Sequence, residues 1–155
     1  MPIQANLTLA MAGGLQDGLV ALFGLGVTVR PPEPQPMAVY ALIFIPREEA
    51  GRHSWRIELT YASGKPVRLA KPIAGIPSDF VFENEADVHG LDDPTLTTPL
   101  TTGPLISLPP FPLPKGREYL WRLTVDGETR DEWTSRFRTS PPVAQQQTAL
   151  RLRPI

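Results

Sequence analysis

Apolar and polar residues alternate along much of the chain, which is the pattern of β-strands that bury one face. The clearest examples are Trp55–Tyr61, Arg117–Val125 and Thr129–Arg138. Their inward-facing positions are predicted to be Trp55, Ile57, Leu59, Tyr61, Tyr119, Trp121, Leu123, Val125, Trp133 and Phe137. Asp126-Gly127 separates the last two strands and favours a two-residue hairpin, because both central residues of that turn need a positive φ.

Three earlier segments also favour strands: Ala5–Met11, Leu19–Val29 and Met37–Ile45. Gly13-Gly14 and a proline cluster at residues 31–36 separate them. Arg47–His53 lacks alternation and is expected to form one short helical turn, with His53 as a solvated turn residue. Seven or eight strands without a long helix predict an all-β fold, a single antiparallel β-sandwich of immunoglobulin-like or similar topology. A closed barrel is the alternative.

The sandwich domain is assigned to residues 1–139, and residues 140–155 to a linker that ends in a strand-like tail. The linker, Ser140–Gln147, has no core-forming pattern. Ala149–Ile155 alternates again, with Leu150 and Leu152 between arginines. Such a tethered amphipathic strand suits addition to the sheet edge of a neighbouring subunit; folding back onto its own domain is the alternative.

Proline is concentrated in Pro99–Pro114, where six of sixteen residues are prolines. Proline cannot donate hydrogen bonds to a strand ladder, so we expect an irregular edge strand that resists pairing with other sheets. A ligand for a groove of the SH3 or WW type is the alternative interpretation.

Three segments carry a family resemblance: Asn6–Met11, Gly18–Val29, and Phe111–Gly127, in which prolines lead to Gly116-x-x-Tyr119, an alternating strand and a turn. They resemble a family of small bacterial β-sandwich proteins that is a domain of unknown function. The resemblance implies the sandwich fold and supplies no activity or site. Tyr119, near the start of a late strand, is expected to pack as a tyrosine corner.

The composition argues against several classes of function. Fifteen basic and sixteen acidic residues give a net charge of −1, so nothing indicates binding to nucleic acid or insertion into a membrane. The absence of cysteine excludes a disulfide framework, a thiolate metal site and a cysteine nucleophile. No secretion signal is recognisable at the start of the sequence. A cytoplasmic protein or a component of an assembled particle is therefore expected.

The sequence contains few residues in patterns typical of catalysis or metal binding. No phosphate-binding glycine loop, nucleophile elbow or paired-histidine zinc motif occurs, so we expect a non-enzymatic protein without a cofactor. The segment Asp79–Asp93 is acidic and offers oxygen ligands of the kind that Ca²⁺ and Mg²⁺ prefer. Its weak metal candidates are Glu83, Glu85, Asp87, Asp92 and Asp93. A charged outer strand face is the alternative, because carboxylates at alternate positions of one strand repel one another.

Two predicted strands do not alternate between apolar and polar residues. Leu19–Val27 carries Leu19, Phe23 and Leu25 on the face assigned to the core, and Met37–Ile45 is apolar on both faces. A two-layer sandwich buries one face of each strand, so the second face needs a cover, either a proline-rich loop or another subunit. The predicted interface residues are Val20, Leu22, Tyr40, Leu42, Phe44, Leu150 and Leu152.

The sequence therefore predicts a non-enzymatic structural or interaction module. It would act as a homo-oligomer or as part of a larger assembly, such as a particle or virion component. The alternative is a ligand-binding β-sandwich module for a divalent cation or a carbohydrate. Exposed tryptophans flanked by carboxylates would favour the carbohydrate site, whereas buried tryptophans would favour assembly.

Overall fold

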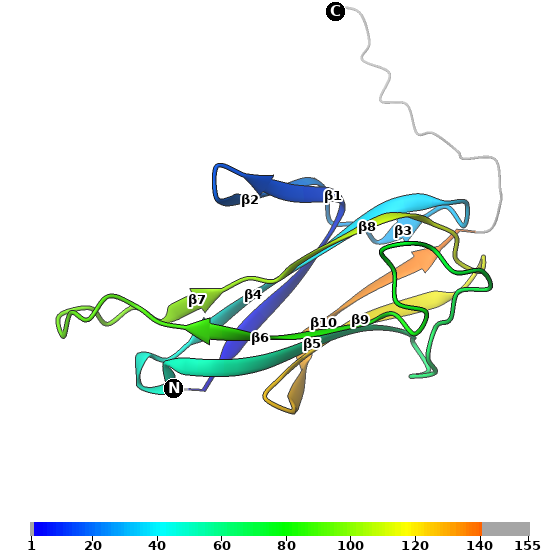
Figure 1. Ribbon diagram of the computed structural model, residues 1–155. Helices are drawn as coiled ribbons and strands as arrows, with labels where there is room; N and C mark the ends of the chain where they lie inside the picture. The colour runs from blue at the N-terminus through cyan, green and yellow to red at the C-terminus, as the bar shows by residue number, and fades with distance from the viewer. Residues whose placement is uncertain (1, 141–155) are drawn as a thin grey trace, which may run out of the picture.

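The structure is a computed structural model that describes residues 2–140, and these residues form two β-sheets (Figure 1). Sheet A contains β1 (Gln4–Gln16), β2 (Leu19–Leu25), β4 (Gln35–Ile45), β7 (Leu100–Thr102) and β8 (Leu105–Phe111). Sheet B contains β3 (Val29–Arg30), β5 (Gly51–Tyr61), β6 (Val81–Val88), β9 (Glu118–Val125) and β10 (Glu128–Thr139). The prediction of an all-β sandwich is confirmed, with ten strands rather than seven or eight.

Strand order explains how the two sheets are built. Sheet A runs β2-β1-β4-β7, with β8 also paired to β4, and sheet B runs β3-β10-β9-β5-β6. Every pairing is antiparallel except that of β3 with β10. Between β4 and β5 lies a single 3-10 turn, η1 (Arg47–Glu49), as the charged run predicted. Within the described residues no helix is long and apolar enough to cross a membrane.

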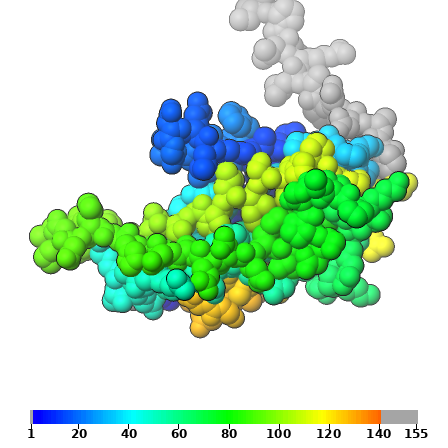
Figure 2. All heavy atoms as spheres, in the orientation of Figure 1, coloured from blue at the N-terminus to red at the C-terminus, as the bar shows by residue number. Residues whose placement is uncertain are grey.

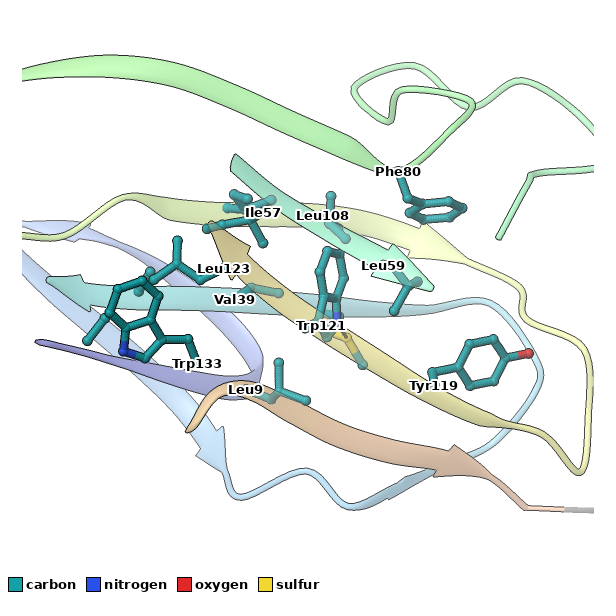
Figure 3. Close-up of a cluster of buried hydrophobic side chains, with 14 of the residues drawn as sticks. Leu9, Val39, Ile57, Leu59, Phe80, Leu108, Tyr119, Trp121, Leu123 and Trp133 are labelled. Carbon is teal, nitrogen blue, oxygen red and sulfur yellow. Dashed lines mark hydrogen bonds between the residues drawn. The ribbon is translucent and has the colours of Figure 1, made fainter. Parts of the chain in front are cut away.

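The core lies between the sheets and is built from the alternating positions (Figure 3). All four predicted inward positions of β9 are buried, as are Trp133 and Phe137 of β10. Trp55 and Tyr61, in the same strand β5, are only half-buried. Trp121 joins the two sheets, because its indole Nε1 on β9 lies 3.3 Å from the sulfur of Met37 on β4.

The first hairpin differs from the prediction. Gly13-Gly14 does not end a strand; β1 continues to Gln16, and the turn falls at Asp17-Gly18, both with positive φ. Close packing accounts for the first of the two glycines, because a methyl group on Gly13 would lie 3.0 Å from side-chain carbons of Ala38 and Leu22. The second predicted turn, Asp126-Gly127, is confirmed, with φ of 51° and 80°.

The proline-rich segment forms the edge strand β8, as expected. Its pairing with β4 shifts register between Leu108 and Phe111, and Pro109-Pro110 occupy that shift. An irregular edge of this kind resists pairing with another sheet.

Two polar side chains, those of Tyr119 and Arg30, donate hydrogen bonds to backbone carbonyls. The Tyr119 hydroxyl donates to the carbonyl of Pro114 at 2.8 Å, so the predicted tyrosine corner is confirmed. Arg30 is buried, donates to the carbonyl of Phe111 at 2.6 Å and lies over the Phe111 ring. Burial lowers the pKa of Arg30 to about 10, which leaves the guanidinium charged at neutral pH.

Candidate functional site

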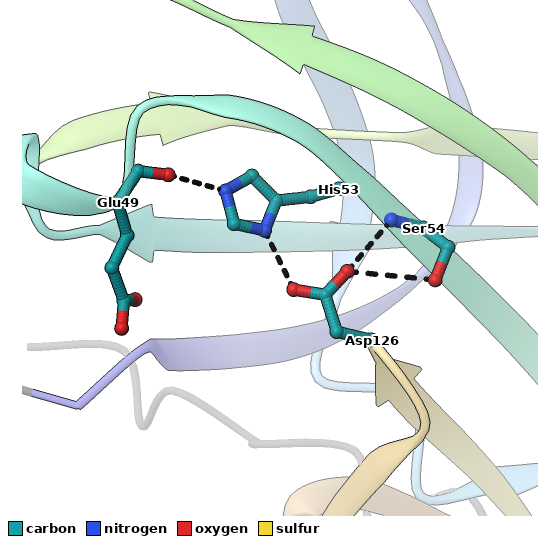
Figure 4. A network of polar contacts seen from close by, with 4 residues as sticks. All are labelled: Glu49, His53, Ser54 and Asp126. Atoms are coloured by element: carbon teal, nitrogen blue, oxygen red, sulfur yellow. Dashed lines mark hydrogen bonds and ion pairs between the residues drawn. The ribbon is translucent and has the colours of Figure 1, made fainter.

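A polar network joins η1, the start of β5 and the β9–β10 turn (Figure 4). His53 Nδ1 lies 2.6 Å from Asp126 Oδ2, and its Nε2 lies 2.6 Å from the carbonyl oxygen of Glu49. The other carboxylate oxygen of Asp126 accepts a hydrogen bond from the backbone N–H of Ser54 at 2.9 Å. His53 was expected to be a solvated turn residue, and this was wrong: it lies within β5 with its side chain 12% exposed.

The charges of this network follow from its geometry. Both ring nitrogens of His53 face acceptors, so both hydrogen bonds form only when the imidazole is protonated. Burial opposes that charge, but the bonds to Asp126 and Glu49 outweigh burial and raise the pKa of His53. For Asp126, burial likewise opposes the charge, while the bonds from His53 and Ser54 prevail and lower its pKa.

The network links three segments of the chain by hydrogen bonds, and a cleft opens beside it. The cleft has a volume of about 460 Å³ and is lined by groups of both charges, including Glu49, Glu128 and Arg130. Both ring nitrogens of His53 are engaged, so neither serves as a general base or a metal ligand without breaking a bond. Its chemical consequence is a dependence of stability on pH.

Replacing His53 with glutamine should lower the free energy of unfolding by about 1 kcal/mol at pH 6. Because the pKa of His53 is raised on folding, its stabilisation is fully present below an unfolded pKa near 6.5 and declines as the pH rises through the folded value. The wild-type protein should therefore lose stability over the pH range above about 6.5, and H53Q should lose less. Urea unfolding across that range measures the difference.

His89 supplies the matched control for this experiment. Its ring also contacts a carboxylate, Asp87 Oδ1 at 2.7 Å, but both side chains are well exposed. Replacing His89 with glutamine should change stability by no more than a few tenths of a kcal/mol. Equal losses in H53Q and H89Q, or a pH profile unchanged by H53Q, would contradict the role assigned to His53.

The acidic candidates do not converge. Glu83, Glu85 and Asp87 follow one another on β6, opposite Arg56, Ser54 and Arg52 of β5. Glu85 pairs with Arg52 at 3.5 Å. Among the described residues no three His, Asp or Glu side chains gather in a way that could hold a metal ion. The arrangement matches the alternative interpretation, a charged outer strand face.

The two candidates beyond β6 lie in the loop that leads to β7. Asp93 accepts hydrogen bonds from the backbone N–H and the hydroxyl of Thr95, at 2.9 and 2.7 Å. These bonds are the first cause of its lowered pKa. Asp93 thus stabilises a local turn, and the neighbouring Asp92 is exposed.

The tryptophans divide between core and surface. Trp121 and Trp133 are buried, whereas half-buried Trp55 lines a cleft of about 460 Å³ together with Glu83 and Glu85. The cleft beside Trp55 combines an accessible aromatic ring with carboxylates, the pair of features named above for a carbohydrate site.

The five predicted interface residues that the structure describes are all half-buried: Val20, Leu22, Tyr40, Leu42 and Phe44. Part of their cover comes from the chain itself. Leu22 packs beside Gly13, and Gly103, between β7 and β8, approaches the Tyr40 ring so closely that a methyl group there would lie 2.5 Å from its hydroxyl oxygen. Leu150 and Leu152 lie outside the described residues.

The β1–β2 hairpin exposes five large apolar side chains, and the sequence pattern assigned three of them, Leu19, Phe23 and Leu25, to the core. Figure 2 shows it standing out from the body of the molecule, in blue. The exposed fractions are Met11 51%, Leu15 74%, Leu19 73%, Phe23 65% and Leu25 63%. Alternation alone missed this surface, since a strand pattern does not say where the opposing sheet ends. The available signal was a strand with two apolar faces and no charge.

Two regions therefore stand out among residues 2–140. In the His53 network the polar groups bond one another, whereas the β1–β2 hairpin leaves apolar side chains in water on a strand at the edge of sheet A. No family model, curated protein or solved structure matches this chain, so the family resemblance stays a prediction.

Proposed function

We propose that the protein is a non-enzymatic interaction module, an immunoglobulin-like sandwich that associates with further copies of itself through the β1–β2 hairpin. The observation that carries the proposal is the exposure of Leu19, Phe23 and Leu25 on the edge strand β2. Contiguous exposed apolar surface is uncommon on monomeric proteins and typically marks a contact with another molecule.

A comparison of the sheet edges supports this assignment. Exposed edge strands pair readily with other chains, and proteins block them with charge, proline, irregularity or shortness. The β6 edge carries three carboxylates, the β8 edge carries Pro109-Pro110, and β3 and β7 are two and three residues long. β2 has seven residues, no charge and no proline, and its irregularity is confined to Gly24, whose φ is 70°. It is the edge among the described strands that charge, proline and shortness do not protect.

The test is the mass in solution, measured by light scattering over a range of protein concentrations. The wild-type chain should exceed its 17.1 kDa monomer mass as the concentration rises. Replacing Phe23 with lysine should return it to the monomer, because a charge on the edge strand must be desolvated on pairing. Replacing Leu91 with lysine should leave association unchanged, because Leu91 is more exposed than Phe23 but lies in the β6–β7 loop.

A chain that ends after Thr139 separates the hairpin from the predicted tail strand. Association that survives this truncation and is lost in F23K supports the hairpin. Association lost on truncation but retained in F23K assigns it to residues 140–155 and overturns the proposal. A wild-type chain that remains monomeric up to millimolar concentration overturns self-association altogether.

The second candidate function, a ligand-binding module, rests on the cleft beside Trp55. Calorimetric titration with CaCl₂ and with neutral hexasaccharides tests it, with Trp55→Ala as the control variant. Heat that is present in the wild type and absent in W55A would favour carbohydrate binding, and no heat with either probe would remove this candidate.

A further inference from the structure

The sequence of β2 is complementary to itself. When two copies of Leu19–Leu25 are aligned antiparallel about Leu22, Leu19 lies opposite Leu25 and Val20 opposite Gly24. In the same alignment the large ring of Phe23 lies opposite the small side chain of Ala21. Cross-strand neighbours on one face are the unit of sheet stability, and large-against-small pairs let both strands approach closely.

The exposed side chains of β2 lack cover from their own hairpin. Phe23 lies opposite Ala12 of β1, and Leu25 lies opposite Ala10. Leu19 and Phe23 share a face because they are an even number of positions apart in a regular stretch of strand, whereas Gly24, with a φ of 70°, interrupts the alternation before Leu25. The alanines are too short to cover Phe23 and Leu25, which explains why about two thirds of each remains exposed.

We propose that two copies of the protein pair β2 to β2, antiparallel about a two-fold axis at Leu22, so that two copies of sheet A become one continuous sheet. The inference rests on the proposed function and names its partner: a second copy of this chain. Such a contact uses the same surface on both subunits and closes at a dimer. In Figure 1 β2 and the turn before it stand out from the rest of the sandwich, and β2 is the end strand of sheet A, so its outer edge has no partner among the described strands.

Charge permits this pairing at β2 and opposes it at the other long edge. Leu19–Leu25 contains no ionisable residue, so two copies meet without like-charge repulsion. The nearest acid, Asp17, would lie ten positions along the paired strands from its symmetry mate, about 33 Å away and beyond the screening length in physiological salt. Two copies of β6 would instead bring Glu83, Glu85 and Asp87 against one another.

The area that two paired copies bury sets the expected stability of the dimer. Edge-to-edge pairing buries the two strand edges and the flanks of Leu19, Phe23 and Leu25, while the face of the sheet stays open. The buried area therefore falls below about 1,200 Å², in the range of weak and transient contacts between proteins. We therefore expect a dimer whose population depends on concentration in the micromolar range, rather than a permanent one.

Engineered cysteines test the register directly, because the protein contains no cysteine of its own. Residues directly opposite in an antiparallel pair have Cβ atoms about 5 Å apart, within reach of a disulfide after small adjustments. A mixture of L19C and L25C proteins, held in a glutathione redox buffer at high protein concentration, should form a linked dimer. Either protein alone should link at least tenfold more slowly, since Leu19 and its symmetry mate lie about 20 Å apart.

Each outcome supports or overturns the inference. Rapid linkage in L19C alone, or in a control mixture of L91C and L25C, would overturn the register. Linkage that appears only after truncation at Thr139 would overturn this pairing for the full chain. A dimer that F23K disrupts but that never links residues 19 and 25 would overturn this pairing and leave the proposed function standing. A monomer at every concentration would remove both.

Discussion

Replacing Trp121 with alanine should lower the free energy of unfolding by about 3–5 kcal/mol, a large fraction of the roughly 5–15 kcal/mol that holds a domain folded. Trp121 is fully buried on β9 and reaches across the sandwich to the Met37 sulfur of β4. Its ring also packs against Phe82 of β6, with 6.4 Å between ring centroids. Removing it leaves a cavity between the sheets that the rigid strands cannot close. Urea unfolding followed by circular dichroism measures the loss.

Trp55 provides the matched control, because it is the same residue type on the neighbouring strand β5 but is only half-buried. Its replacement by alanine should cost about 1–2 kcal/mol. Trp121→Phe should fall between the two, since it fills most of the space and loses the N–H contact with Met37. Equal losses at Trp121 and Trp55 would contradict the assignment of Trp121 as the packing centre between the sheets.

The β9–β10 half of the fold was predictable because its signals are local. Each strand buries one face, and the turn between them has residues that suit positive φ, so alternation and turn chemistry agree. Trp133 and Phe137 are buried where the alternation placed them. The tyrosine corner followed from the same local reasoning, since Tyr119 bonds a carbonyl only five residues earlier.

The β1–β2 half was less predictable because its outcome depends on distant parts of the chain. Gly13-Gly14 has the composition of a turn, yet Gly13 serves close packing against Ala38 of β4. The two apolar faces of β2 are equivalent in sequence, and only the extent of sheet B decides which of them stays in water. Local composition cannot supply that information, so Phe23 was assigned to the core.

The candidate sites were likewise predictable where their signals are local and unpredictable where they depend on distant residues. The charge of β6 was recognised because it follows from alternation within one strand, and its carboxylates indeed face a row that contains arginines. His53 was misplaced because its partner Asp126 lies 73 positions away in the sequence. Arg30 was not singled out in the sequence for the same reason, because the Phe111 carbonyl that it bonds lies 81 positions away. Contacts of this length carry no signal in one sequence without an alignment.

The second large effect on stability is expected at the tyrosine corner, where two hydrogen-bond donors share one acceptor. The Pro114 carbonyl accepts from the Tyr119 hydroxyl at 2.8 Å and from the Thr139 hydroxyl at 2.7 Å. Thr139 also accepts from the backbone N–H of Arg117, at 3.2 Å. Burial, the largest cause, raises the pKa of Tyr119 to about 12, so its phenol stays a donor at every pH at which folding is measured.

Tyr119→Phe and Thr139→Val should each cost about 1–1.5 kcal/mol, because one donor to Pro114 remains in either single variant. The double variant removes both donors and should cost about 3–4 kcal/mol, more than the sum of the singles by about 1 kcal/mol. Urea unfolding of the four proteins forms a double-mutant cycle that isolates this coupling. Strict additivity would mean that water replaces the lost donors at Pro114, so that the two hydroxyls act independently. A Tyr119→Phe variant as stable as the wild type would mean that the corner stabilises the sandwich by the packing of the Tyr119 ring against Phe137 rather than by its hydroxyl.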